Sequence, residues 1–132
     1  ICPRWSEVTL GGDTVSKYTD LLFTGIEFTG THVVDASAMT RVHVDVWTKD
    51  ATFFKVKLVD FGADGVFGNG NDTEHEVNFA AGTSPALVSG QWVSIDLPFT
   101  SFPGLASRSH LAQFVMSAST ATVFVANVYF HR

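Results

Sequence analysis

The sequence lacks paired cysteines and clustered positive charge, and each absence excludes a class of protein. Cys2 is the single cysteine among 132 residues, so no disulfide can form within the chain. Eight lysine and arginine residues are scattered along a chain whose formal net charge is −5. Because nucleic-acid-binding proteins need a stripe of positive charge to neutralise phosphates, nucleic acid is not an expected partner.

Long apolar runs and signatures of catalysis are also missing. No apolar run approaches the ~20 residues that span a bilayer, and no membrane partner is expected. The sequence holds no serine-hydrolase elbow, no zinc-protease motif and no phosphate-binding loop. Paired carboxylates for glycoside hydrolysis are defined by their separation in space, so the sequence leaves them open. Small antiparallel sandwiches seldom enclose a catalytic cleft, however, and we expect a protein without enzymatic activity.

What the sequence does contain is the composition of strands and turns. Twelve Phe, three Trp and eleven Gly accompany many Val and Thr, and no window keeps a 3.6-residue apolar period. Strand-like runs alternate with clusters of Gly, Pro, Asp, Asn or Ser. The expected strands cover residues 7–10, 21–28, 41–47, 52–60, 74–79, 91–97, 111–117 and 122–130. This pattern predicts an all-β fold, an antiparallel β-sandwich.

One domain is expected from this length. Residues 1–5, with Pro3 as a breaker, are predicted to be the remnant of a linker, and residues 6–132 a single module. The chain begins at Ile1 without a start methionine or a signal peptide, so we expect it to be a segment of a longer protein.

Alternation along the predicted strands separates core side chains from outward ones. Val42, Val44 and Val46 are expected to face the core. The strands at 41–47 and 54–60 are expected to form a hairpin, since turn-forming residues connect them. The outward set of this hairpin is His43, Asp45, Trp47, Lys55 and Lys57. Such a face suits hydrogen bonding to hydroxyl groups beside a stacking ring; an ordinary solvated face with cross-strand ion pairs is the alternative.

The remaining tryptophans and the last strand carry further expectations. Trp92, Ser94 and Asp96 alternate outward along their strand. Trp5 could cover an open sheet edge or a ligand. Residues 122–130 are apolar on both faces and are predicted to form a central strand.

An acidic, glycine-rich stretch over residues 60–76 is the most unusual part of the sequence. It holds five of the thirteen acidic residues and no Lys or Arg. Carboxylates this close repel one another unless a hard cation sits among them, and calcium takes about six to eight oxygen ligands. The expected ligands of one structural Ca²⁺ are Asp60, Asp64, Asn69, Asn71, Asp72 and Glu74. A solvated turn between two strands is the alternative.

Four runs of residues carry a resemblance to a known group of proteins: VVDASAMTRVHVDVWT at 33–48, FKVKLVDFGADGVFG at 54–68, GQWVSIDLP at 90–98 and TVFVANVYF at 122–130. In combination they resemble the β-jelly-roll carbohydrate-binding modules that are appended to bacterial polysaccharide-degrading enzymes, β-glucanases among them. The resemblance implies a jelly roll, a secreted parent protein, and a non-catalytic role. In that role the module targets a covalently linked glycoside hydrolase to a polysaccharide, with a β-glucan favoured. Because such modules share the motif at the start of the strand that follows Gly90 and Gln91, the resemblance also implies a packing role for Trp92.

The resemblance also implies a structural calcium, with one departure. The last strand of such modules often reads Val-Asp-Asn-Val, with the Asp frequently a calcium ligand, whereas Ala126 precedes Asn127 here. The expected calcium site is therefore the acidic stretch rather than the usual position near the two ends of the chain. The alternative function is a structural or protein-docking β-sandwich of a larger secreted enzyme.

Overall fold

The computed structural model describes residues 4–28, 30–68 and 70–132, and these residues form strands and turns. The strands are β1 (Arg4–Leu10), β2 (Asp13–Glu27), β3 (Arg41–Thr48), β4 (Phe54–Asp60), β5 (Thr73–Phe79), β6 (Val93–Pro98) and β7 (Leu111–His131). Two short 3₁₀ helices, η1 (Gly30–His32) and η2 (Phe99–Ser101), lie between strands. No helix in the described ranges is long and apolar enough to cross a membrane.

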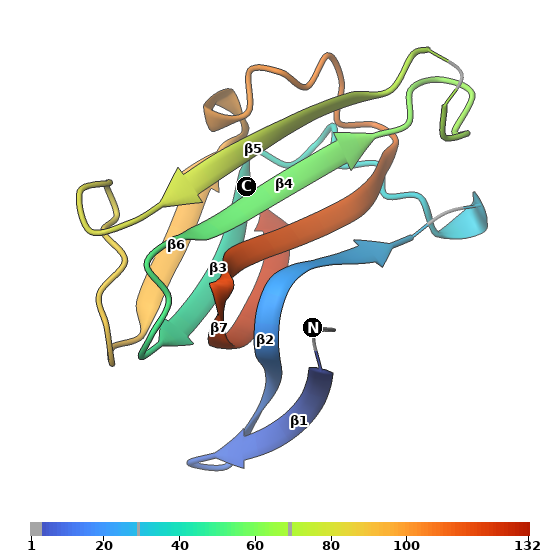
Figure 1. Ribbon diagram of the computed structural model, residues 1–132. Helices are drawn as coiled ribbons and strands as arrows, with labels where there is room; N and C mark the ends of the chain where they lie inside the picture. The colour runs from blue at the N-terminus through green and yellow to red at the C-terminus, as the bar shows by residue number, and fades with distance from the viewer. Residues whose placement is uncertain (1–3, 29, 69) are drawn as a thin grey trace.

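Two long strands, β2 and β7, belong to both layers of a sandwich (Figure 1). In one layer β2 pairs with β1, β7 pairs with β3, and β3 pairs with β6. In the other layer β7 pairs with β4, and β4 pairs with β5. The first layer therefore has the order β1-β2-β7-β3-β6, and the second has the order β5-β4-β7-β2. Every pair is antiparallel, which confirms the predicted all-β jelly-roll sandwich.

Both long strands bend where they pass from one layer to the other. Asp20 in β2 and Thr120 in β7 have positive φ angles of 57° and 56°. The register between the two strands shifts on both sides of Leu21. Because bulges of this kind bend a strand and increase its twist, one continuous ladder can turn the corner of the sandwich. The two layers are therefore covalently continuous through β2 and β7.

The core lies between the layers and follows the alternation that the sequence predicts. Val42, Val44 and Val46 of β3 are buried, and so are Val56 and Leu58 of β4. The buried phenylalanines of the same cluster are Phe54, Phe79, Phe102 and Phe114. Full burial of a side chain of this size contributes about 1.5–3 kcal/mol to folding. The core thus fixes which side of each strand faces outward.

Most predicted strands are confirmed, with corrections to their pairing and bounds. The hairpin predicted for residues 41–47 and 54–60 is wrong, because β3 lies between β6 and β7 whereas β4 lies between β5 and β7. The turn residues between β3 and β4 connect the two layers instead. The runs predicted at 111–117 and 122–130 form one continuous strand, which is central as expected. Strand β2 begins at Asp13, well before the predicted start.

The predicted linker remnant also differs from the structure. Arg4 and Trp5 begin β1, where they pair with Thr19 and Tyr18 of β2. Residues 1–3 lie outside the described residues. Because Arg4 and Trp5 both belong to this ladder, the sandwich begins within the segment that was predicted to be a linker.

Candidate functional site

The outward side of the layer formed by β2, β7, β3 and β6 gathers polar and aromatic side chains from distant parts of the chain. The core alternation of β3 places His43, Asp45 and Trp47 on this outer face, as predicted. Pairing then sets His43 opposite Asp96 of β6 and Tyr129 of β7. We call the solvent-facing side of this layer, on which His43, Asp45 and Trp47 lie, the outer face.

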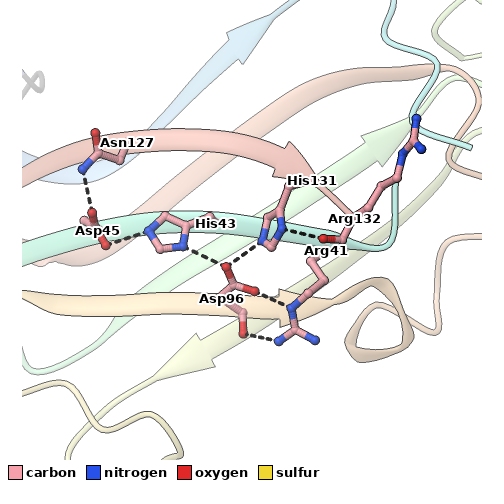
Figure 2. A network of polar contacts seen from close by, with 7 residues as sticks. All are labelled: Arg41, His43, Asp45, Asp96, Asn127, His131 and Arg132. Atoms are coloured by element: carbon pink, nitrogen blue, oxygen red, sulfur yellow. Dashed lines mark hydrogen bonds and ion pairs between the residues drawn. The ribbon is translucent and has the colours of Figure 1, made fainter. Parts of the chain in front are cut away.

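Asp96 is the centre of a polar network on the outer face (Figure 2). Its Oδ2 atom lies 2.9 Å from His43 Nδ1 and 2.7 Å from His131 Nε2. Its Oδ1 atom accepts a hydrogen bond from Arg41 Nε, and a second Arg41 nitrogen donates to the Asp96 main-chain oxygen at 3.0 Å. One carboxylate therefore holds three side chains of two other strands in place.

The network continues from His43 to the next carboxylate along β3. His43 Nε2 lies 2.8 Å from Asp45 Oδ1, and Asn127 Nδ2 donates to Asp45 Oδ2 at 2.8 Å. Asn127 has a φ angle of 53° and lies where the register between β3 and β7 shifts. Asn adopts this left-handed conformation more readily than most residues, and a bulge re-aims its side chain. The bulge thus brings the Asn127 amide onto the outer face.

The charges of this network perturb two ionisable groups in opposite directions. Hydrogen bonds from Arg41 and then His43 hold the pKa of Asp96 well below its usual range. Burial of the His43 ring by itself lowers the pKa of the imidazole, but hydrogen bonds to Asp96 and Asp45 outweigh it, and the pKa of His43 is raised. The network therefore stabilises the ionised form of Asp96 and the protonated form of His43, relative to the same groups in water.

Aromatic rings flank the polar network. Tyr129 stacks on the His43 ring with 4.8 Å between centroids and 13° between planes, and it remains 48% exposed. Trp47 meets Phe124 edge to face at 5.5 Å, and Lys17 Nζ lies 5.6 Å from the centroid of the same Phe124 ring. Stacked and edge-to-face pairs of this kind hold rings in fixed orientations.

A hollow of about 530 Å³ lies on the outer face beside the network. Trp92, which immediately precedes β6, is 41% exposed and lines it. The full lining is Leu10, Asp13, Thr14, Val15, Asp45, Trp92, Ser94, Ala126 and Asn127. The predicted packing role of Trp92 is therefore wrong. Trp92 lies at the edge of the layer, where its side chain is partly open to solvent.

Two of the predicted site residues lie elsewhere. Lys55 and Lys57 belong to β4, so they point outward from the opposite layer. Lys57 Nζ is 2.8 Å from Glu74 Oε2, and Lys55 Nζ is 3.6 Å from Glu76 Oε1. They are ion-paired across β4 and β5 rather than gathered with His43, Asp45 and Trp47, because the β3–β4 hairpin on which the prediction relied does not exist.

The carboxylates of the acidic stretch do not converge on one point. Asp60 is buried and accepts hydrogen bonds from the main-chain nitrogens of Gly62 and His110 at 2.8 and 2.9 Å. Glu74 is paired with Lys57 of β4, a cation from outside the acidic stretch. Both carboxylates therefore have partners within the protein, and their part in the expected calcium ligand set stays a prediction.

The other two acidic members of the expected calcium set, Asp64 and Asp72, accept hydrogen bonds from the main chain. Asp64 Oδ1 accepts a hydrogen bond from Val66 at 3.0 Å, and Asp72 Oδ2 accepts one from Gly68 at 2.8 Å. Asp72 Oδ1 is buried without a hydrogen-bond partner in the described part of the chain. Asn69 lies outside the described residues. Within those residues no three His, Cys, Asp or Glu side chains are grouped to hold a metal ion, so calcium stays a prediction.

Comparisons with known proteins agree with the fold. No protein-family model matches the chain, and no curated protein matches it. Solved structures do match. A family 30 carbohydrate-binding module is similar over 96% of this chain and 73% of its own, with a TM-score of 0.69 and 15% identity.

Two matching structures from Clostridium thermocellum contain a bound sugar. The family 11 module in complex with a β-1,3-1,4-mixed-linked tetrasaccharide matches over 98% of this chain and 82% of its own, with a TM-score of 0.63 and 13% identity. The CBM22-1–GH10 modules of the xylanase Xyn10B, complexed with xylohexaose, match over 98% of this chain and 24% of theirs, with a TM-score of 0.63 and 11% identity. The chain therefore has the jelly-roll fold of carbohydrate-binding modules, as its sequence resemblance implies.

Proposed function

We propose that this protein is a non-catalytic carbohydrate-binding module that holds a polysaccharide on the outer face, with a β-glucan as the favoured ligand. The observation that carries the proposal is the hollow in which the exposed Trp92 ring and the fixed polar groups of Asp45 and Asn127 lie together. An indole covers the apolar face of a sugar ring, while neighbouring carboxylate and amide groups bond its hydroxyls.

The polar network supports binding because its geometry is already fixed. Asp45 is held from both sides, by His43 and by Asn127, and His43 is held in turn by Asp96. Ordering a flexible side chain on binding costs about 0.5–1.5 kcal/mol, so side chains that are ordered beforehand bind a ligand more tightly. Free lone pairs on a held carboxylate can then accept hydroxyl hydrogens from a sugar.

The choice of β-glucan rests on the sequence resemblance and on one structural neighbour, the family 11 module solved with a β-1,3-1,4-mixed-linked tetrasaccharide. A xylan is the competing ligand, because the Xyn10B modules are solved with xylohexaose. The proposal includes secretion and a covalently linked catalytic domain, since some of the matching modules belong to cellulosomal or multimodular enzymes.

A protein-docking role is the second candidate, and a different surface favours it. Leu22, Phe23 and Ile26 are exposed on β2, where that strand forms the edge of the second layer. Exposed apolar side chains at a sheet edge are typical of interaction surfaces. Docking there and sugar binding on the outer face predict different sensitive residues.

Affinity electrophoresis against mixed-linkage β-glucan, xylan, mannan and alginate tests the proposal. The protein is expected to be retarded by the β-glucan, and Trp92→Ala to lose most of this retardation. Trp5→Ala is the matched control, because Trp5 is 57% exposed on β1 and does not line the hollow. Equal retardation of Trp92→Ala and the parent protein, or no retardation by any polysaccharide, would contradict the proposal.

A further inference from the structure

The tip of the β1–β2 hairpin is built so that it can form a wall of the hollow. Gly11 and Gly12 connect the two strands with φ angles of 58° and 92°, and Leu10 pairs with Asp13 across the turn. A two-residue turn with positive φ at both positions matches the right-handed twist of a hairpin. The turn thus fixes where Leu10 and Asp13 emerge.

This tip lies across the layer from Trp92. The order β1-β2-β7-β3-β6 puts the hairpin at one edge and the approach to β6 at the other. Leu10 and Asp13 nevertheless line the same hollow as Trp92, with Asp45 and Asn127 between them. A ligand in the hollow is therefore flanked by the hairpin on one side and by the indole on the other.

The charge of the hollow is of one sign. Asp13 and Asp45 are carboxylates, and no Lys, Arg or His is among the described residues that line it. The cations nearby are engaged in other contacts: Arg41 bonds to Asp96, and Lys17 lies over the Phe124 ring. When His43 is protonated, His43 and Arg41 balance the charges of Asp45 and Asp96. Asp13 takes part in no ion pair among the described residues, so its charge leaves the hollow negative.

We propose that the hairpin tip is a specificity-determining part of the site. Leu10 and Asp13 complete the wall opposite Trp92, and the charge of Asp13 beside Asp45 disfavours sugar units that carry a carboxylate or a sulfate relative to uncharged ones. The inference rests on the proposed function, since it names which class of polysaccharide the same hollow accepts. Like charges a few ångströms apart repel one another, and salt screens this repulsion.

The test compares one polysaccharide in two charge states. Dissociation constants for mixed-linkage β-glucan and for its carboxymethylated derivative are measured at about 20 mM and 500 mM salt, for the parent protein, Asp13→Asn and Glu7→Gln. Glu7→Gln is the matched control, because it removes the same charge from the same hairpin at a residue that does not line the hollow. Thermal unfolding of each variant verifies that the hairpin substitutions leave the fold intact.

The parent protein is expected to bind the carboxymethylated glucan at least about threefold more weakly than the neutral one at low salt, with the difference shrinking at high salt. Asp13→Asn should reduce this difference, and Glu7→Gln should leave it unchanged. Equal affinity of the parent for both glucans, or equal effects of the two variants, overturns the inference alone. Failure of the parent protein to bind the neutral glucan overturns the proposed function and the inference with it.

Discussion

Replacement of Asp96 by Asn is expected to destabilise the fold in a way that depends on pH. Asn has nearly the same shape as Asp and keeps one acceptor oxygen, but it removes the negative charge that Arg41, His43 and His131 share. The substitution thus removes the electrostatic part of three contacts while leaving the packing of β6 intact.

The loss of unfolding free energy in Asp96→Asn depends on how far solvent screens the contacts of Asp96. A hydrogen bond to a charged group contributes about 1.5–3 kcal/mol when it is shielded and less when solvent screens it. Asp96 is 31% exposed and His43 is 12% exposed, so the contacts are partly shielded. We expect a loss of about 2–3 kcal/mol near pH 6. With an unfolding entropy of about 0.28 kcal/mol/K for 132 residues, the melting temperature should fall by about 7–11 °C.

The stabilisation by the network is expected to decrease both at low pH, through Asp96, and at high pH, through His43. The pKa of Asp96 is lowered by folding, so its contribution is present above about pH 4 and is lost as the pH falls towards the folded value. The pKa of His43 is raised by folding, so its contribution is present below about pH 6.5 and is lost as the pH rises through the folded value. The difference between the parent protein and Asp96→Asn should therefore be largest at about pH 5–6.

Thermal unfolding by circular dichroism between pH 3 and pH 9 measures this difference. Glu76→Gln is the control, because Glu76 is paired with Lys55 on the opposite layer and no histidine takes part in that contact. It should shift the melting temperature by less than about 3 °C, with no maximum near pH 5–6. A difference for Asp96→Asn that is constant across the whole range would refute the electrostatic account of the network.

Two further predictions concern residues away from the hollow. Replacing Lys55 or Lys57 by Ala should leave the affinity for polysaccharide within about twofold of the parent value, because both lysines lie on the opposite layer. A large loss of affinity in either variant would place the binding site on that layer instead. Calcium binding by the acidic stretch now rests on Asp72: EDTA should lower the melting temperature and CaCl₂ should restore it, since an ion bound only by the folded state adds stability. The double variant Asp64→Ala with Asp72→Ala should abolish the response, and a parent protein insensitive to EDTA would exclude calcium from this loop.

The fold was more predictable from the sequence than the site was. The pattern that predicts a strand lies within a few neighbouring residues, whereas the site depends on which distant strands pair with one another. Alternation with period 2 is local, so the inward valines of β3 and the outward His43, Asp45 and Trp47 could be read correctly. The neighbours of β3 depend on pairing with residues about 50 to 90 positions away, for which a single sequence gives no local signal. Lys55 and Lys57 were misplaced for this reason.

Other parts of the site were missed although a signal existed. Alternation placed Trp92 and Asp96 outward, but without the β3–β6 pairing neither could be joined to His43 and Asp45. Asn127 gave only a weak signal, because Asn tolerates positive φ in many turns and bulges. In the acidic stretch the excess of acids was real, but its partners, Lys57 and the main-chain nitrogen of His110, came from outside the stretch.

The continuity of β2 and β7 through both layers has a consequence for how the chain acquires its structure. Ser16 pairs with Val125 and Glu27 pairs with Gln113, so the ladder between β2 and β7 joins segments 86 to 109 residues apart. Closing so long a loop costs entropy before any contact offsets it, and folds of this kind form slowly. During synthesis on the ribosome neither layer can be completed until β7 has emerged. Until then β3 and β4 lack the strand that pairs with both of them, so aggregation competes with folding in this interval.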